Sequence, residues 1–183
     1  MLAVALTAGA ATADAAKKPK RSVECAQGAT GGLNVSEGRC IKFKKARLIN
    51  GKAVAPASAP AKVKRVIARA NRIDPLPYNW GGGRRTWPNV DPSGYDCSGA
   101  VSYALRGLGA KALPSPLPSG PLMSWGKAGK GRWITVYSNP GHAYMVVAGL
   151  RFDTSMTPGD GPGWSKSMRS TSGRFVARSW PGF

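Results

Sequence analysis

The feature that most constrains the fold is a series of four β-strand-like segments in the last third of the chain. Each segment is rich in β-branched and aromatic residues, and Gly-containing turns separate the first three. The segments are RWITVYS (132–138), HAYMVVA (142–148), LRFDTS (150–155) and RFVARSW (174–180). Because neighbouring segments are joined by only a few residues, we expect them to pair as an antiparallel meander.

Two segments with helical periodicity precede these strands. Residues 61–72 carry apolar side chains at i, i+3, i+4 and i+7, with Lys and Arg on the other positions. In the second segment Asp96 is suited to be the N-cap and Gly109 the stop. Its apolar stripe comprises Val101, Ala104, Leu105 and Leu108. Helices followed by a meander predict an α+β fold, with N-terminal helices packed on an antiparallel β-sheet.

The remaining segments read as loops and linkers. Residues 74–94 are rich in Pro and Gly, and 110–131 are also loop-like. The Ala/Pro segment AVAPASAP (53–60) predicts an extended, poorly packed linker. We therefore divide the chain into a signal peptide (1–15), a basic N-terminal region with its linker (16–60) and a C-terminal domain (61–183).

The N-terminus predicts export. A short apolar stretch ends in Ala13-Asp14-Ala15, an A-x-A cleavage site. The basic residues that normally precede such a stretch are missing, so we expect the true start to lie further upstream; the alternative is a buried Ala-rich helix. No other segment has the ~20 apolar residues that span a bilayer. We expect a secreted or cell-wall-associated protein.

The net charge of +19 predicts adhesion to polyanions. Residues 1–72 hold 15 Lys or Arg against three acidic residues, and residues 73–183 hold 12 against five. For an exported chain an anionic cell-wall polymer is the expected partner, rather than a specific nucleic acid. A generally solvated basic surface is the alternative for the C-terminal part.

The chain has three cysteines, an odd number. Cys25 and Cys40 flank a Gly-rich segment that can fold back as a hairpin, so they are a candidate disulfide. Cys97 is then left over, either as an intermolecular link or as a free thiol with a chemical role. With three cysteines and one histidine we expect no metal site.

Cys97 has the position of a nucleophile. In the first turn of a helix it faces unpaired backbone N–H groups and the positive end of the helix dipole, and both favour the thiolate. The neighbouring Asp96 opposes this unless its carboxylate serves as the cap. A cysteine nucleophile needs a base, and His142 is the only histidine.

Asp153 is the natural group to orient that imidazole. If Ala148-Gly149 forms a tight turn, Val147 pairs with Leu150, and Asp153 lies on the same face of the sheet as His142. Asp91 or a backbone carbonyl is the rival for this role. Taken singly, Cys97 and His142 read as a small core side chain and a structural polar residue; taken together in an exported chain they favour catalysis.

Three blocks carry a resemblance to a known family. They are PYNWGGG (77–83), DCSGAVSYAL (96–105) and GHAYMVVAG (141–149). They resemble the signature blocks of the NlpC-type family of bacterial peptidoglycan endopeptidases, which have a papain-like fold. The resemblance covers about residues 61 to 180, and its most specific part is the D-C-S-G block with its spacing to the histidine block.

The resemblance implies a set of roles. It makes Cys97 the nucleophile and His142 the base, and it puts Asp153 near the third polar residue, where other residue types are more common. Tyr78 matches a tyrosine beside the nucleophile, while Asp96 and Ser98 match positions that help to bind the stem peptide. It further implies cleavage between D-glutamate and the diamino acid of peptidoglycan. We expect a monomer that needs no cofactor.

Two other functions stay open. A related cysteine N-acetylmuramoyl-L-alanine amidase or acyltransferase would use the same residues on another bond. A non-enzymatic basic protein that binds the cell wall would not need Cys97 at all.

Overall fold

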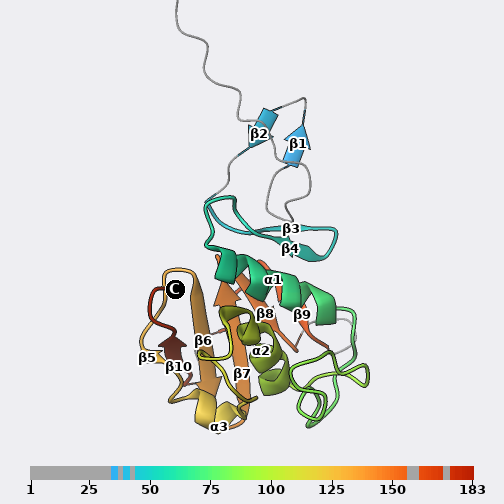
Figure 1. Ribbon diagram of the computed structural model, residues 1–183, viewed down its shortest axis with the longest axis vertical. Coiled ribbons are helices and arrows are strands. Elements are labelled where there is room, and N and C mark those ends of the chain that lie inside the picture. Colours follow the sequence, from blue (N-terminus) through green and yellow to red (C-terminus); the bar gives the residue numbers. More distant parts are fainter. Residues whose placement is uncertain (1–33, 37–38, 42–43, 156–160, 171–173) are drawn as a thin grey trace, which may run out of the picture.

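An antiparallel sheet of six strands lies at the centre of the molecule (Figure 1). The computed structural model describes residues 34–36, 39–41, 44–155, 161–170 and 174–183. Along the sheet the strand order is β5-β10-β6-β7-β8-β9. The strands are β5 (Lys127–Ala128), β6 (Ile134–Asn139), β7 (His142–Val147), β8 (Leu150–Asp153), β9 (Gly163–Ser165) and β10 (Val176–Ser179).

Helices cover one face of this sheet (Figure 1). They are α1 (Ala61–Ile73), α2 (Cys97–Leu105), the short 3₁₀ helix η1 (Arg106–Leu108) and α3 (Ser119–Leu122). Alternate residues of the central strands face them, because successive side chains of a strand point to opposite sides. Ile134, Val136, Ala143, Met145 and Val147 are all completely buried. The predicted α+β fold is confirmed.

The long elements lie where the sequence predicts them. Both helices begin within one residue of the expected position, and each of the four expected strands is present. The prediction of loop over 110–131 missed β5 and α3, and β9 was missed as well. These elements have only two to four residues, too few to show a hydrophobic period.

The Ala/Pro segment is a correction to the sequence analysis. Residues 53–60 are extended at their start, but Ala53, Ala55 and Ala59 are buried in the core. The hairpin of β3 (Arg47–Ile49) and β4 (Lys52–Val54) precedes them. Asn71 of α1 accepts a hydrogen bond from the Ala53 N–H at 3.0 Å and donates one to its C=O at 2.8 Å. Small alanine side chains let this strand approach the helix closely, so the segment packs on the domain.

Other predictions for the N-terminal region fall largely outside the described residues. β1 (Asn34–Ser36) pairs with β2 (Arg39–Ile41), and Cys40 lies opposite Val35. The predicted signal peptide and Cys25 lie outside the described residues, as does the side chain of Cys40, so their disulfide stays a prediction. None of the helices in the described ranges is long and apolar enough to cross a bilayer.

The 74–94 segment is a loop, as predicted, and it packs tightly on the start of α2. A Cβ at Gly99 would lie 2.1 Å from the Gly82 carbonyl oxygen, so only glycine permits this approach. The loop also donates backbone hydrogen bonds from Gly81 to Asp96 and from Gly83 to Asp91, each 3.1 Å long. The glycines thus hold the WGGG turn against the helix that carries Cys97.

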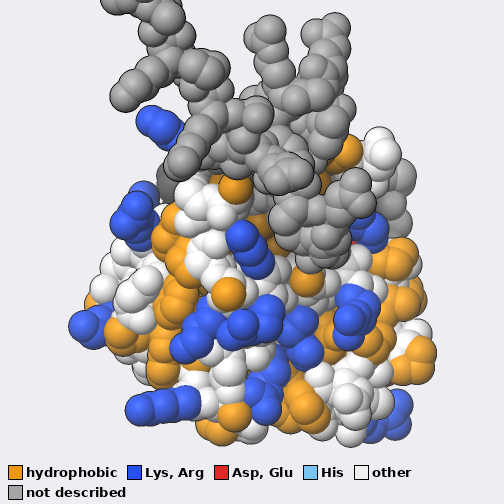
Figure 2. Space-filling view, turned by 45° about the horizontal axis from the view of Figure 1, so that its top comes forward, with side chains coloured by type: hydrophobic (Ala, Val, Ile, Leu, Met, Phe, Trp, Pro, Cys, Tyr) orange, Lys and Arg blue, Asp and Glu red, His pale blue; other side chains and the backbone are white. Residues whose placement is uncertain are grey.

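Positive charge dominates the surface of the described residues. Figure 2 shows many Lys and Arg side chains gathered on one face. Asp91, Asp96 and Asp153 are buried, and Asp74, the fourth carboxylate of the described ranges, is half-buried and bonded to Lys52 at 2.7 Å. The acidic residues that the structure describes therefore do little to offset the basic side chains.

Candidate active site

Cys97 is the first residue of α2, as the sequence predicts. Asp96 caps the helix through a 2.6 Å hydrogen bond from the Gly99 N–H to its Oδ1. The thiol is nearly buried, with 8% of the residue exposed. It is hydrogen-bonded to His142 and receives a hydrogen bond from the backbone N–H of Ala143. The helix start therefore brings the sulfur directly against the start of β7.

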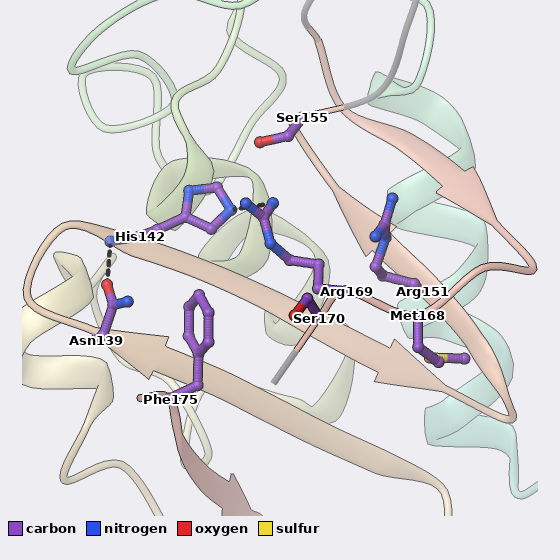
Figure 3. Close-up of a pocket in the computed structure, with 8 residues that line it drawn as sticks. All are labelled: Asn139, His142, Arg151, Ser155, Met168, Arg169, Ser170 and Phe175. Carbon is purple, nitrogen blue, oxygen red and sulfur yellow. Dashed lines mark hydrogen bonds between the residues drawn. The ribbon is translucent and has the colours of Figure 1, made fainter. Parts of the chain in front are cut away.

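His142 is the first residue of β7, at the end of the β6–β7 turn. Asn139 fixes that turn, because its side-chain oxygen accepts hydrogen bonds from the backbone N–H groups of Gly141 at 3.0 Å and His142 at 2.8 Å (Figure 3). The imidazole lies 6.5 Å from the Tyr144 ring and 6.3 Å from the Phe175 ring, centre to centre. Turn and rings together hold the imidazole in one orientation.

Asp153 reaches His142 because of the β7–β8 register. Val147 pairs with Leu150 and Met145 with Phe152, which is the register expected from the sequence. The side chain of Asp153 is fully buried, and its Oδ1 is 2.9 Å from His142 Nε2. Since a carboxylate only accepts, Nε2 carries the proton of this bond, and Nδ1 is the ring nitrogen left to face the thiol.

Arg169 is a member of the site that the sequence analysis missed. Its Nη1 donates a 2.8 Å hydrogen bond to Asp153 Oδ2 and lies 3.2 Å from His142 Nε2 (Figure 3). The Nε of Arg151, on β8, lies 3.6 Å from the same oxygen of Asp153. No motif surrounds Arg169, and only the path of the chain after β9 brings it here. Arg151 follows from the register, because it lies two residues before Asp153 on the same strand face.

These contacts polarise the site. Burial raises the pKa of the Cys97 thiol, but the hydrogen bonds from His142 and the Ala143 N–H, with the charge of His142, bring it below its usual value. Burial lowers the pKa of His142, but Asp153 and Cys97 raise it to about 9. For Asp153, hydrogen bonds from His142 and Arg169 outweigh burial and lower the pKa to about 2. These contacts therefore shift Cys97 toward the thiolate and His142 toward the imidazolium.

The three residues to which the resemblance gives substrate binding lie around Cys97, and Tyr78 also lines a hollow with His142. Asp96 and Ser98 flank the thiol in sequence, and both are hydrogen-bonded to Arg84. Arg84 Nη1 is 2.5 Å from Asp96 Oδ2, and its Nη2 is 2.7 Å from Ser98 Oγ. Tyr78 is more exposed to solvent. Its pKa is raised, mainly by partial burial and to a lesser extent by the negative charges of Cys97 and Asp96. Arg84 is thus a second arginine that the sequence analysis missed.

Two hollows adjoin at His142. One of about 250 Å³ is lined by Tyr78, His142, Thr154 and Ser155. The other, of about 530 Å³, lies on the Arg169 side and shares His142 and Ser155 with the first (Figure 3). An extended ligand that lies across the imidazole can therefore occupy both. Among the residues that the structure describes, no group of three or more His, Cys, Asp or Glu side chains is placed to hold a metal ion.

A thiol at a helix start, an imidazole at a strand start and a carboxylate on the next strand define a candidate cysteine-hydrolase site on an α+β fold. The resemblance that the three sequence blocks carry is supported by similarity to a curated peptidoglycan endopeptidase. No family model matches the chain.

The relatives found are mycobacterial. The chain is 31% identical over 132 residues to the peptidoglycan endopeptidase RipB of Mycobacterium tuberculosis, in strains CDC 1551 / Oshkosh and ATCC 25618 / H37Rv alike. The match covers 61% of this chain and 54% of RipB, so the chain spans about half the length of the curated relatives it matches.

Among the solved structures that match is that of RipD from Mycobacterium tuberculosis. It is described as a non-catalytic NlpC/p60 domain protein adapted to peptidoglycan binding. The TM-score is 0.48 at 22% identity, and the match covers 66% of this chain and 98% of that chain.

Proposed function

We propose that this chain is a cysteine peptidase that acts outside the cytoplasm and cleaves the peptide stems of peptidoglycan. The observation that carries the proposal is the contact of Cys97 with His142 and of His142 with Asp153, at a helix start where a thiolate is favoured. The relationship to the endopeptidase RipB supports the substrate class.

In the proposed mechanism the thiolate of Cys97 attacks the carbonyl carbon of the scissile amide. The carbonyl oxygen becomes an oxyanion beside the backbone N–H groups of the first turn of α2. His142 then gives its proton to the leaving amine as the C–N bond breaks, and a thioester remains. His142 next takes a proton from water, whose oxygen attacks the thioester carbonyl. The acid product leaves, and the thiolate and imidazolium are restored.

The bond that the resemblance implies is the amide between D-glutamate and the diamino acid. Tyr78, Asp96 and Ser98 would contact the acyl part of the stem, which they approach from the Cys97 side. Arg84 already occupies the outer oxygen of Asp96 and the hydroxyl of Ser98. A substrate ammonium group would therefore compete with Arg84 for Asp96, so a stem without a free amino terminus suits this side of the site.

The deciding experiment is mass analysis of the fragments released from purified peptidoglycan by the wild type and by Cys97→Ala. We expect the wild type to release stem fragments cut after D-glutamate and Cys97→Ala to release none. Fragments that begin at L-alanine would instead identify the amidase. Transfer products would identify an acyltransferase. Release of no fragments by either protein would favour a non-catalytic wall-binding protein, as RipD is described.

We also propose that the basic surface holds the protein on anionic cell-wall polymers. Such attraction is mainly Coulombic and weakens as added salt shortens the Debye length. A tethered basic segment raises the local enzyme concentration on an insoluble substrate without touching the active site. The region before residue 44 is suited to this role, because it is basic and lies ahead of the packed hairpin of β3 and β4.

Two truncations separate tethering from folding. Deleting 16–43 should lower binding to sacculi and their cleavage, as a few hundred millimolar salt should, while cleavage of a soluble stem peptide stays the same. Deleting 16–52 also removes β3 and the Lys52–Asp74 ion pair, so it should lower the melting temperature as well. A loss of soluble-peptide cleavage in the shorter deletion would count against the tether.

A further inference from the structure

The larger hollow beside His142 has a chemistry that the proposed mechanism does not use. It holds about 530 Å³ and is lined by His142 and by Arg169, whose Nη1 lies 3.2 Å from Nε2 of the imidazole (Figure 3). Two guanidinium groups line it, those of Arg151 and Arg169, together with the hydroxyl groups of Ser155 and Ser170. All four groups can donate hydrogen bonds, and a guanidinium group has no acceptor atom.

The carboxylate nearest to these arginines does not cancel their charge inside the hollow. Asp153 lies beneath them with a fully buried side chain, whereas Arg169 keeps 29% and Arg151 13% of the side chain exposed. Asp153 also bonds the imidazolium of His142. Among the described residues, two guanidinium groups and an imidazolium thus share one carboxylate, so the described lining of the hollow carries net positive charge.

Arg169 is both held in place and partly available. Its guanidinium lies 5.8 Å from the Tyr144 ring centre and 6.0 Å from that of Phe175, which fixes its plane. Within the described residues only its Nη1 donates a hydrogen bond, and the acceptor is Asp153. The Nε and Nη2 groups therefore remain for a ligand, and guanidinium N–H groups match the two oxygens of a carboxylate.

The hollow lies on the leaving-group side of the reaction. The acyl part of a substrate stays on Cys97, while the amine departs toward His142, which protonates it. Tyr78 and Asp96 are on the thiol side, and the arginines are beyond the imidazole. A side chain or terminal group of the residue that supplies the amine therefore points into this hollow.

We propose that Arg169 and Arg151 form a carboxylate-binding subsite for the residue on the leaving-group side of the scissile bond. This inference rests on the proposed function, in which that residue is a diamino acid with carboxyl groups of its own. The subsite would make the protein prefer stems in which these groups are ionised over stems in which they are amidated.

The test measures binding without cleavage. The Cys97→Ala protein is titrated calorimetrically with two tripeptides: N-acetyl-L-alanyl-γ-D-glutamyl-meso-diaminopimelate, and the same peptide with both diaminopimelate carboxyl groups converted to carboxamides. We expect the carboxylate form to bind about tenfold more tightly or better, as for a charge-assisted hydrogen bond. Adding Arg169→Gln or Arg151→Gln should bring the ratio close to one. Arg72→Gln, a change on the exposed side of α1, should leave the ratio unaltered.

The ratio separates recognition from structural damage. A merely structural role for Arg169 would weaken both tripeptides equally, and a melting curve of each variant shows whether it is folded. Equal affinity for the two forms, absence of binding by either, or a ratio that survives in both arginine variants would overturn the subsite. Wild-type protein that cleaves neither tripeptide nor peptidoglycan would overturn the proposed function instead, and the measured ratio would still decide on the subsite.

Discussion

The two halves of the candidate site are built in different ways. On the helix side, Asp96, Cys97 and Ser98 are consecutive, and the cap to Gly99 spans three residues. On the sheet side, His142 and Asp153 are 11 residues apart, and Arg169 is 27 residues from His142. Local sequence fixes the first half. The second depends on strand register, where a slip of one residue would turn Asp153 to the other face.

The two halves also differ in how their carboxylates are used. Asp96 caps α2 with one oxygen and binds Arg84 with the other, so its charge raises the pKa of Cys97 only as a minor opposing effect. Asp153 directs its charge at His142 and raises the pKa of the imidazole. Each half thus pairs one carboxylate with arginine, but only the sheet side uses the carboxylate to hold a proton in the site.

The largest expected effect comes from removing the contact between the two halves. Cys97→Ala and His142→Ala should each lower cleavage of a soluble stem peptide by ~10³-fold or more, because nucleophile and base act as one unit. Circular dichroism and thermal melting should show both variants folded. A folded Cys97→Ala protein with wild-type fragment release would refute the thiol mechanism.

Next come two substitutions of Asp153. Asp153→Ala should lower kcat/KM by ~10²-fold, less than His142→Ala, since Asp153 orients the imidazole without exchanging a proton. It should also lower the free energy of unfolding by about 1–3 kcal/mol, because two guanidinium groups lose their ion pair with Asp153. Asp153→Asn still accepts a hydrogen bond and should be milder in both measurements. Equal, complete losses of activity would mean that the negative charge itself is essential.

The pH dependence of activity tests whether Cys97 and His142 form a thiolate–imidazolium ion pair. Activity should fall above about pH 9, where His142 loses its proton, and on the acid side, where the Cys97 thiolate is protonated. Asp153→Asn should move the alkaline limb from about 9 toward 6.5, the ordinary value for histidine. The His142 contribution to stability should likewise be complete below pH 6.5 and disappear as the pH rises through about 9.

The rate of iodoacetamide alkylation gives the same titration from the thiol side. In His142→Ala the pKa of Cys97 should rise, because the hydrogen bond and the positive charge that lower it are lost. An alkylation profile identical to that of the wild type would show that the two side chains are not coupled.

The smallest effect should come from the arginine on the helix side. Arg84→Ala leaves the Asp96 charge without its ion pair, so the pKa of Cys97 should rise slightly and alkylation near neutral pH should slow by about two- to fivefold. Stability should change by about 0–1 kcal/mol, since 29% of the Arg84 side chain is exposed. A larger loss of stability in Arg84→Ala than in Asp153→Ala would mean that the helix side contributes more than the sheet side.

By itself, the sequence determined the elements that carry long periodic patterns and the parts of the site that depend on them. It placed α1, α2 and four strands, put Cys97 behind an Asp96 cap and set the register that joins Asp153 to His142. These features depend on contacts between residues near in sequence, or on a two-residue period and one tight turn. Three-residue strands such as β9 have no period to detect.

Only the tertiary structure determined which arginines belong to the site and whether the Ala/Pro segment packs on the domain. Arg169 and Arg84 have no signature, since any Lys or Arg of a basic chain looks alike in sequence, and only the loops that carry them bring each to one carboxylate. Ala53, Ala55 and Ala59 read as linker, because small residues suit both a flexible chain and a close approach to a helix. These alanines are buried because Asn71 and α1, which are distant in sequence, pack against them. The sequence around the alanines does not reveal this packing.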